Sequence, residues 1–305
     1  MKPRIPRHLP LLGLAGLCAL ALLIGGYAGI YDMRQTGASG QQHVGRVKVL
    51  YAGSLAHVLE NAIAPAFMQS TGGKFQGVAG GSTGLAHEIR DKIRRADIFI
   101  SARPEVNKRL MDARNGDWVD WYISFMSSPL VIGYNPNSKF AAEFASMPWY
   151  EVVSLPGFRL GRTDERIDPK GDLTIQAIEQ TAKLLRRPGL ATQIMENTQV
   201  FPEQGLVGRL QTGQLDAGFF YRGEALAVGL PTVSIEPISL GAKYTITLLK
   251  HAPNPDGAIH FISFLLGAQG RDILQENGFE LLTPATLTGD ESALPQALKP
   301  LLEAK

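Results

Sequence analysis

Two serines follow predicted strands at points where each strand is expected to end. Ser54 lies in "YAGSL" after the predicted strand 47–52, and Ser82 lies in "GGSTG" after the predicted strand 74–79. Each begins a segment with helical spacing of apolar residues, so each turn presents unpaired backbone N–H groups and the positive end of a helix dipole. Such donors bind an oxyanion. Because serine is also a preferred N-cap residue, helix capping alone explains the same residues.

Two acidic residues occupy comparable positions further along the chain. Asp168 precedes Pro169 in "GRTDERIDPKG", ahead of a predicted helix that Asp172 or a neighbour would cap. Glu203 follows a proline at another predicted helix start. Taken locally, Asp before Pro shapes a turn, and a Glu in a first helical turn complements the helix dipole. Neither acid by itself predicts a ligand site.

The stretch "GGSTG" also fits the G-x-S-x-G nucleophile elbow of serine hydrolases, with Ser82 as the attacking group. The acid and the histidine would follow in the required order, as Asp168 or Asp216 and then His251 or His260. Against this alternative, the serine follows only the second predicted strand, and no earlier HGGG-type segment supplies an oxyanion hole. A fluorophosphonate probe separates the two readings, because it labels only an activated serine.

The elements that must position these residues predict an α/β fold. Strands are predicted at 47–52, 74–79, 96–102, 128–135, 217–221 and 243–250, with helices at 54–72, from 82 to about 94, and across 255–278. The first five of these elements in chain order alternate strand and helix, which predicts parallel strands with helices on the faces of the sheet. Turns after neighbouring parallel strands meet at one edge, so Ser54 and Ser82 are expected to converge on one crevice.

Seven motifs between about Val47 and Gly278 are informative as a set. They are "AGSL" (52–55), "GGSTGLAHEI" (80–89), "ADIFISA" (96–102), "DWYISFMSSPLVIGYNPNSKF" (120–140), "PWYEVV" (148–153), "GRTDERIDPKG" (161–171) and "GQLDAGFFYRGEA" (213–225). In this order they resemble the periplasmic molybdate/tungstate-binding proteins of ABC transporters, and most closely the archaeal-type branch. No single motif carries the resemblance.

The resemblance implies a periplasmic-binding-protein-like α/β fold of type II topology. Two lobes, each with a mixed, mostly parallel sheet flanked by helices, would be joined by two hinge strands near 128–134 and 243–249. Lobe one would comprise 46–127 plus 246–305, and lobe two would comprise 128–245. Closure of the two lobes on a ligand would then be a hinge motion.

The resemblance also assigns the ligand site. It places the oxyanion-binding serines at Ser54 and Ser82, two carboxylates at Asp168 and Glu203, and a tyrosine beside the site at Tyr221. In that branch the two carboxylates bond the metal atom of the oxyanion itself. This chain departs from the pattern in having a shorter segment between the two acids and different residues around Glu203.

Two carboxylates in an oxyanion site are physically informative. At an effective dielectric near 20 they would repel a dianion by several kcal/mol, and sulfate or phosphate cannot relieve that repulsion. Molybdenum(VI) and tungsten(VI) can expand their coordination from four oxygen ligands to six, which turns each carboxylate into a donor. If both acids line the site, selectivity against sulfate follows.

The implied function is that of an extracytoplasmic solute-binding protein, which captures molybdate and/or tungstate and delivers it to the membrane subunits of an ABC transporter. The chain would be no enzyme, would carry no cofactor apart from its ligand, and would act as a monomer. The alternatives are a serine hydrolase using Ser82 and a receptor of the same fold for another anion, such as sulfate, a ferric complex or an organic anion.

The first 31 residues predict a signal peptide or an N-terminal membrane anchor, because Lys2, Arg4 and Arg7 precede an apolar run long enough to span a bilayer. Residues 32–45 are polar and Gly-rich, which predicts a linker. Without the first 30 residues, which hold three positive and no negative side chains, the formal net charge falls from +2 to −1. The remaining chain has no extended basic run, which argues against nucleic acid as a partner.

Overall fold

The computed structural model describes residues 44–303, and for Glu203, Gln204 and Glu303 it describes the backbone alone. The predicted signal or anchor segment, 1–31, lies outside the described residues, as does the predicted linker up to residue 43. In the described part, no helix is both long and apolar enough to cross a membrane. Residues 44–305 group as one compact unit.

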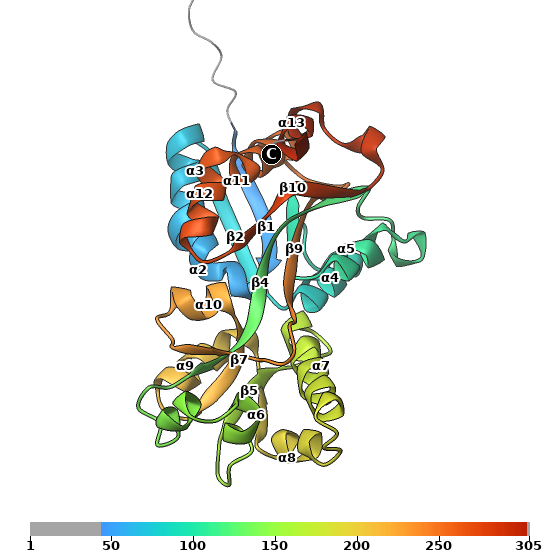
Figure 1. Ribbon diagram of the computed structural model, residues 1–305. Helices are drawn as coiled ribbons and strands as arrows, with labels where there is room; N and C mark the ends of the chain where they lie inside the picture. The colour runs from blue at the N-terminus through green and yellow to red at the C-terminus, as the bar shows by residue number, and fades with distance from the viewer. Residues whose placement is uncertain (1–43, 304–305) are drawn as a thin grey trace, which may run out of the picture. The chain divides into compact units, whose positions relative to one another are not determined.

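Ten strands form one mixed sheet in the described part of the chain (Figure 1). Their order is β2-β1-β3-β9-β4-β7-β5-β6, and β8 and β10 both pair with β4. The strands are β1 Arg46–Ala52, β2 Lys74–Gly80, β3 Ile98–Ser101, β4 Trp121–Tyr134, β5 Leu160–Thr163, β6 Thr198–Phe201, β7 Ala217–Tyr221, β8 Thr232–Ser234, β9 Gly241–Leu248 and β10 Glu280–Gly289.

The long strand β4 belongs to two sections of this sheet. Its first part pairs with β9 and β10, which with β1, β2 and β3 form the upper section in Figure 1. Its last part, from Leu130, pairs with β7 and β8, which with β5 and β6 form the lower section. Strands β1 to β3 are mutually parallel, as are β5 to β7, whereas every pair that involves β4 or β9 is antiparallel.

The two predicted hinge strands differ in the structure. β4 starts at Trp121, seven residues before the predicted strand, and continues through both sections. β9 pairs only with β3 and β4 within the described residues, so the chain re-enters the upper section before Gly241. The lobe boundaries 46–127 plus 246–305 and 128–245 stay a prediction.

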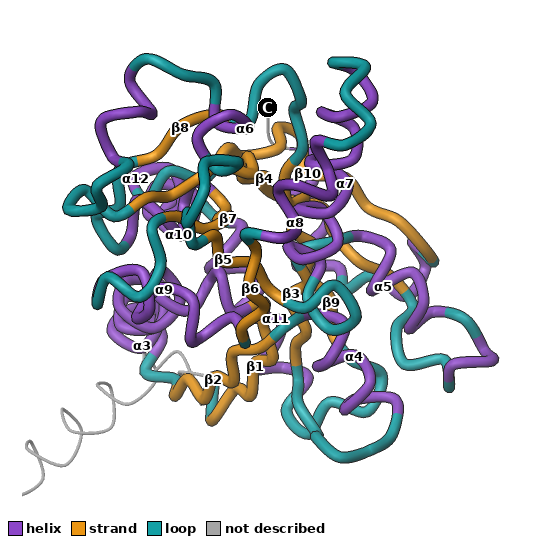
Figure 2. Tube along the Cα trace, turned by 90° about the horizontal axis from the view of Figure 1, so that it is seen from below, coloured by secondary structure: helices purple, strands orange, loops and turns teal. Residues whose placement is uncertain are grey.

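Helices cover both faces of each section. In the upper section α2, α3, α11 and α12 lie on one side and α4 and α5 on the other, and in the lower section α7 and α8 lie opposite α9 and α10 (Figures 1 and 2). The helices are η1 Gly53–Leu55, α2 Ala56–Val58, η2 Leu59–Ile63, α3 Ala64–Thr71, α4 Ser82–Arg90, α5 Pro104–Met111, η3 Ala113–Asn115, η4 Ala141–Ala145, α6 Trp149–Val152, α7 Pro169–Leu184, α8 Leu190–Glu196, α9 Glu203–Gln211, α10 Arg222–Ala227, α11 Pro255–Leu266, α12 Ala268–Glu276, η5 Glu291–Ala293, η6 Gln296–Leu298 and α13 Lys299–Glu303.

Strand β1 is mostly apolar because both of its faces are covered. Val49 and Tyr51 join the apolar cluster that includes residues of α3 and α11, whereas Leu50 joins the cluster that includes residues of α4 and α5. Successive strand residues point to opposite faces, so a strand covered on both faces needs apolar residues at consecutive positions. The carboxyl end of β1, and the turn with Ser54 that follows it, lie at the edge between the two sections.

Helix α7 starts one turn earlier than the sequence predicts. Asp168, not Asp172, is its N-cap, and Asp168 Oδ1 accepts the backbone N–H of Lys170 at 2.9 Å. Pro169 occupies the first helical position, where its missing N–H costs nothing and its fixed φ suits the helix. The Asp-Pro pair is thus a helix start as well as a turn.

Two other predicted helices end differently from expectation. Helix α4 stops at Arg90 instead of near Arg94, because Lys92 adopts a left-handed φ of 59° that no helix can continue through. The helical region predicted across 255–278 is two helices, α11 and α12, which separate at Gly267. The residues that follow α4 line a cavity of the upper section.

Candidate functional site

Both predicted serines lie at the carboxyl ends of neighbouring parallel strands. Ser54 is in η1, directly after β1, and Ser82 is the first residue of α4, shortly after β2. The two strands pair in parallel with Ala52 opposite Gly80, so the two turns lie side by side at one edge of the sheet. Ser54 is 4% exposed and Ser82 is 1% exposed.

Neither serine side chain caps a helix. The N-cap of α4 is Gly81, and Ser82 Oγ accepts the backbone N–H of Ala102 at 3.1 Å. Ser54 Oγ shares a hydrogen bond of 3.0 Å with the hydroxyl group of Tyr244. The capping explanation is therefore wrong for both residues. Since the Ser82 oxygen accepts a bond, its own proton is still available to donate to a ligand.

The Ser82 turn packs directly against the turn that precedes α7. The backbone N–H of Gly84 donates to the carbonyl oxygen of Ile167 at 3.1 Å, which joins the upper section of the molecule to the lower one. A Cβ atom added at Gly81 would lie 2.4 Å from the same carbonyl oxygen. Close approach of the two turns therefore requires glycine at position 81. This contact explains why Gly81 of "GGSTG" is a glycine, and it does so without a nucleophile elbow.

Asp168 is buried with one carboxylate oxygen engaged and the other not. Asp168 is 4% exposed, and its Oδ1 atom caps α7. Within residues 44–303, no hydrogen-bond partner reaches Asp168 Oδ2. The hydroxyl oxygen of Thr163, at the end of β5, is likewise buried and has no partner in the described chain. Buried polar atoms are normally satisfied, so two such atoms near each other indicate a place for a ligand.

The two residues that carry these atoms line a cavity of about 400 Å³ between the two sections. Residues from three segments line it, among them Gly80 and Gly81, Thr163 and Asp168, and Pro202. Pro202 is the residue before Glu203, so α9 begins at this cavity. The side chain of Glu203 is outside the described atoms. The structure thus brings the Ser82 turn, Asp168 and the start of α9 to one place.

Ser54 and Tyr221 are joined to each other through Tyr244. The rings of Tyr221 and Tyr244 meet edge to face with centroids 6.1 Å apart, and Tyr244 in turn bonds Ser54. Tyr221 is 1% exposed and ends β7 in the lower section, whereas Ser54 belongs to the upper section. Helix α9 also lies beside the turn that holds Ser54. The predicted site residues therefore surround one interface, although Ser54, Ser82 and Tyr221 are not among the residues that line the cavity of about 400 Å³.

A buried ion pair that the sequence did not predict lies behind Asp168. Lys170 is fully buried, and its Nζ lies 2.9 Å from Oε1 and 2.8 Å from Oε2 of Glu224. Burial raises the pKa of the Glu224 carboxyl group, the nearby charge of Asp168 raises it further, and the Lys170 ammonium opposes both. The pair joins the start of α7 to the start of α10. Its only signal in the sequence is a lysine two residues after a candidate ligand.

Three of the other groups that a hydrolase could use, Asp168, Asp216 and His251, are engaged elsewhere. Asp216 is buried and accepts hydrogen bonds from Arg159 and from the hydroxyl group of Ser138. His251 packs edge to face against Trp118, with centroids 5.5 Å apart, in a different cavity. Asp168 holds the N-terminus of α7. None of these contacts orients a base toward Ser82.

An α/β fold whose two sections present strand-end turns to a shared cavity is that of a type II solute-binding protein. The chain belongs to the bacterial extracellular solute-binding protein family, whose model matches residues 47–280. It is 30% identical over 295 residues to an uncharacterized solute-binding protein of Petrotoga mobilis, with 85% of this chain and 90% of the relative covered. The family places the protein outside the cytoplasm.

Two further comparisons agree with this assignment. The chain is 25% identical over 347 residues to a molybdate/tungstate-binding protein of Thermococcus kodakarensis, with 95% of this chain and 96% of the relative covered. Its fold is similar to that of a periplasmic molybdate-binding protein of Azotobacter vinelandii, with a TM-score of 0.63 and 18% identity over 77% of this chain and 99% of the other. The second likeness confirms the predicted type II fold.

Proposed function

We propose that the protein captures molybdate and/or tungstate between its two sections and delivers it to the membrane subunits of an ABC transporter. The observation that carries the proposal is the buried Asp168 Oδ2, which has no donor among the described residues and belongs to a residue that lines a cavity of about 400 Å³. A carboxylate accepts hydrogen bonds but cannot donate them, and the same holds for sulfate. A metal centre that accepts electron pairs suits this oxygen, whereas an anion whose surface consists of acceptor oxygens does not.

Donors for the oxo groups of the ligand are present around the same cavity. Ser82 keeps a hydroxyl proton, and the Thr163 hydroxyl group has no partner in the described chain. The positive ends of α4 and α7 also meet here, which favours an anion. We assign the second carboxylate to Glu203, because α9 begins beside the cavity, and we retain Ser54 and Tyr221 as residues that support the interface.

The relatives support this ligand class, since the Thermococcus kodakarensis protein is a molybdate/tungstate-binding protein. The membrane subunits of a transporter are the partners that such a receptor requires. The protein acts as a monomer, performs no chemistry on its ligand and needs no further cofactor. The segment 1–31 either is removed on export or holds the protein at the membrane.

Parallel calorimetric titrations of the purified protein with molybdate, tungstate, sulfate and phosphate test the proposal. Molybdate or tungstate is expected to bind at least tenfold more tightly than sulfate, because one metal–carboxylate bond is worth more than about 1.4 kcal/mol. X-ray absorption of the complex should report six oxygen ligands on the metal. Equal affinity for sulfate, or a metal that stays four-coordinate, would contradict the proposal. Labelling of Ser82 by a fluorophosphonate probe would favour the hydrolase instead.

A further inference from the structure

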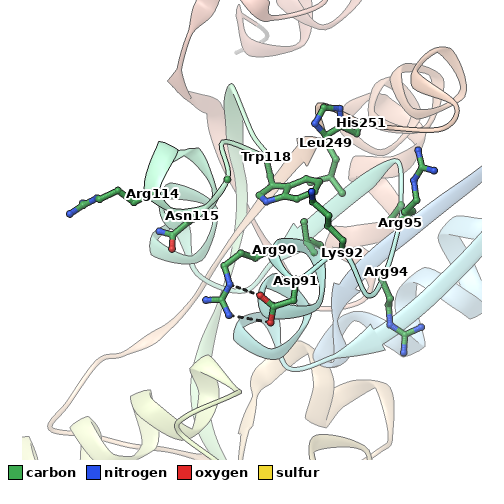
Figure 3. A pocket seen from close by; sticks show the side chains of 13 residues that line it. Arg90, Asp91, Lys92, Arg94, Arg95, Arg114, Asn115, Trp118, Leu249 and His251 are labelled. Atoms are coloured by element: carbon green, nitrogen blue, oxygen red, sulfur yellow. Dashed lines mark hydrogen bonds and ion pairs between the residues drawn. The ribbon is translucent and has the colours of Figure 1, made fainter.

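A second, larger cavity lies on the upper section, beyond the C-terminal end of α4. Its volume is about 720 Å³, and its walls come from the residues after α4, from the segment after η3, and from the chain that follows β9. Figure 3 shows Trp118 in the middle of this basic pocket, with positively charged side chains around it. The basic residues that line it are Arg90, Lys92, Arg94, Arg95, Arg114 and His251.

Positive charge in the basic pocket is only partly compensated. Arg90 pairs with Asp91, Arg94 with Glu88, and Arg114 with Asp112. In the part of the chain that the structure describes, Lys92 and Arg95 form no ion pair, and both are exposed. Two of the five cationic side chains therefore lack an acidic partner, although residues 31–305 as a whole carry a formal charge of −1. An approaching anion is therefore attracted to this part of the surface.

The backbone around the basic pocket is held in uncommon conformations. Lys92 has a φ of 59° and Asp117 has a φ of 52°, so both are left-handed residues other than glycine. Such residues are uncommon and cost free energy, and they cluster at functional sites. In Figure 3 the Lys92 side chain extends over the pocket toward Trp118. The left-handed turn at Lys92 both ends α4 and presents this unpaired ammonium group.

The basic pocket adjoins the ligand cavity between the two sections. Arg94 lines both cavities, and its ion-pair partner Glu88 lines the smaller one. Gly84, on the same helix, also lines the smaller cavity and bonds the loop that leads to Asp168. The helix α4 therefore runs between the two cavities, with unpaired cations at one end and the candidate ligand site at the other.

We propose that the basic pocket is an auxiliary anion site, which collects the oxyanion before it enters the cavity at Asp168. This inference rests on the proposed function for the identity of the anion. The pocket has far more room than a tetrahedral oxyanion needs, so the anion would be held with its water shell and exchange rapidly. Exposed cations attract such an anion over about one Debye length, and salt screens that attraction. The pocket would thus raise the association rate, and the affinity would rise by the same factor because the dissociation rate is unchanged.

Fluorescence quenching tests the anion site without any reference to molybdate. The chain has three tryptophans, of which Trp121 and Trp149 are each 3% exposed, so Trp118 is the one open to a quencher. Iodide, an anion, is expected to quench Trp118 more strongly than the cation caesium, and the double variant Lys92→Gln/Arg95→Gln should remove most of that difference. Sulfate or molybdate should compete with iodide. Equal quenching by iodide and caesium in the unmodified protein would overturn the proposal.

Stopped-flow binding then tests the role in capture. In Lys92→Gln/Arg95→Gln the association rate for molybdate should fall about 3- to 10-fold at low salt, with the dissociation rate unchanged, and the deficit should vanish at high salt. The control, Lys183→Gln/Arg186→Gln, removes the same charge from the far end of α7 and should leave the rate alone. Association rates that are equal in the two double variants would refute the role in capture. If none of the oxyanions binds in the titrations, the proposed function fails, while the iodide result still decides the anion site.

Discussion

Asp168 uses its two carboxylate oxygens differently. One caps α7 and the other is buried without a donor in the described chain, so under the proposed function the residue would link helix stability to ligand binding. A substitution to alanine would remove both roles at once, whereas asparagine keeps an N-cap oxygen and loses the charge. The substitution Asp168→Asn therefore separates the capping role from the proposed ligand-binding role.

The variant Asp168→Asn is expected to bind molybdate or tungstate roughly tenfold or more weakly, because a charged donor to the metal is lost. Its free energy of unfolding without ligand should change by less than about 0.5 kcal/mol, since asparagine caps as well as aspartate. Glu203→Gln should weaken binding to a similar extent. Calorimetry and denaturant unfolding measure the two quantities.

Asp164→Asn is the matched control for this prediction. Asp164 lines the same cavity, but its carboxylate pairs with Arg166, which with a backbone bond holds its pKa at about 2. Its loss should leave oxyanion affinity within about twofold, as expected for an exposed ion pair. If Asp168→Asn binds as well as Asp164→Asn, the six-coordinate ligand is wrong.

Thr163→Val should change binding and stability in opposite directions. Valine has nearly the same shape but no hydroxyl group, so removal of a buried, unpartnered oxygen is expected to leave the ligand-free protein as stable or more stable, by up to about 1 kcal/mol. Oxyanion binding should weaken by about 1.5–3 kcal/mol, because a hydrogen bond to a charged ligand is lost.

Thr181→Val provides the comparison. Thr181 also has a buried oxygen without a partner in the described chain, but it lies inside α7 and does not line the cavity. Its substitution should stabilise the protein similarly and leave affinity unchanged. Loss of affinity in both variants would show that Thr163 acts only through packing.

At the candidate site, the sequence predicted the positions of the turns more accurately than the contacts of individual side chains. The turns with Ser54 and Ser82 were correctly placed at strand ends, and Asp168 was correctly placed before a helix, because strand-to-helix spacing is a local property. The roles of side chains were harder to predict, since they depend on distant partners: Ser54 bonds a tyrosine 190 residues away, and Lys170 bonds a glutamate 54 residues away. Thr163 had no signal at all, because its environment exists only in the folded chain.

The Lys170–Glu224 ion pair connects helices α7 and α10. Such pairs are weak evidence of stability while intact, but removal of one partner leaves a buried charge without compensation. The pair also carries positive charge close to Asp168, whose charge raises the pKa of Glu224. It therefore belongs to the electrostatics of the site as well as to the packing of the two helices.

Lys170→Met is expected to destabilise the protein by about 3–5 kcal/mol at neutral pH. Without the ammonium group, burial raises the pKa of Glu224 further above its unfolded value near 4.3. A carboxyl group with a raised folded-state pKa contributes stability below the unfolded pKa, and this is lost as pH rises through the folded value. The deficit should therefore shrink as the pH is lowered toward 4, as measured by denaturant unfolding.

Two variants control for the loss of lysine. Lys170→Met/Glu224→Gln should recover much of the lost stability, because no unpaired charge remains buried. Lys183→Met, on the exposed end of the same helix, should change stability by less than about 0.5 kcal/mol. A deficit in Lys170→Met that persists unchanged in the double variant and at acid pH would show that the ion pair is irrelevant.

Element boundaries were predicted well where local chemistry sets them and poorly where pairing does. The start of α11 at Asn254 and Pro255 follows from N-cap and N1 preferences. The seven extra residues of β4 and the whole of β10 were not predicted as strands, since they are fixed by antiparallel pairing between segments far apart in sequence. A left-handed lysine at position 92 is equally invisible in a single sequence.

The molecule is held with its two sections in contact. One link is the hydrogen bond from Gly84 to Ile167, and another is the ion pair between Arg103 of the upper section and Asp172 on α7. Gly84 and Ile167 line the candidate ligand cavity, and Asp172 lies one turn of α7 beyond Asp168. A ligand that contacts both sections would add to the same set of links.

Arg103→Gln should favour separation of the two sections in the absence of ligand. Because a partly exposed ion pair is worth up to about 1 kcal/mol, oxyanion affinity should fall by no more than about fivefold. Small-angle scattering should show a larger radius of gyration without ligand, and saturating molybdate should restore the original value. Arg187→Gln, which breaks a pair within the lower section, should do neither. Identical scattering from the two variants would contradict this prediction.

The strand β4 has a consequence for how the protein melts. Since its two ends are hydrogen-bonded into different sections, neither section retains a complete sheet when the other is lost. Heat should therefore disrupt both in one cooperative event. A guest trapped between them would protect the entire polypeptide, including helices that it never touches.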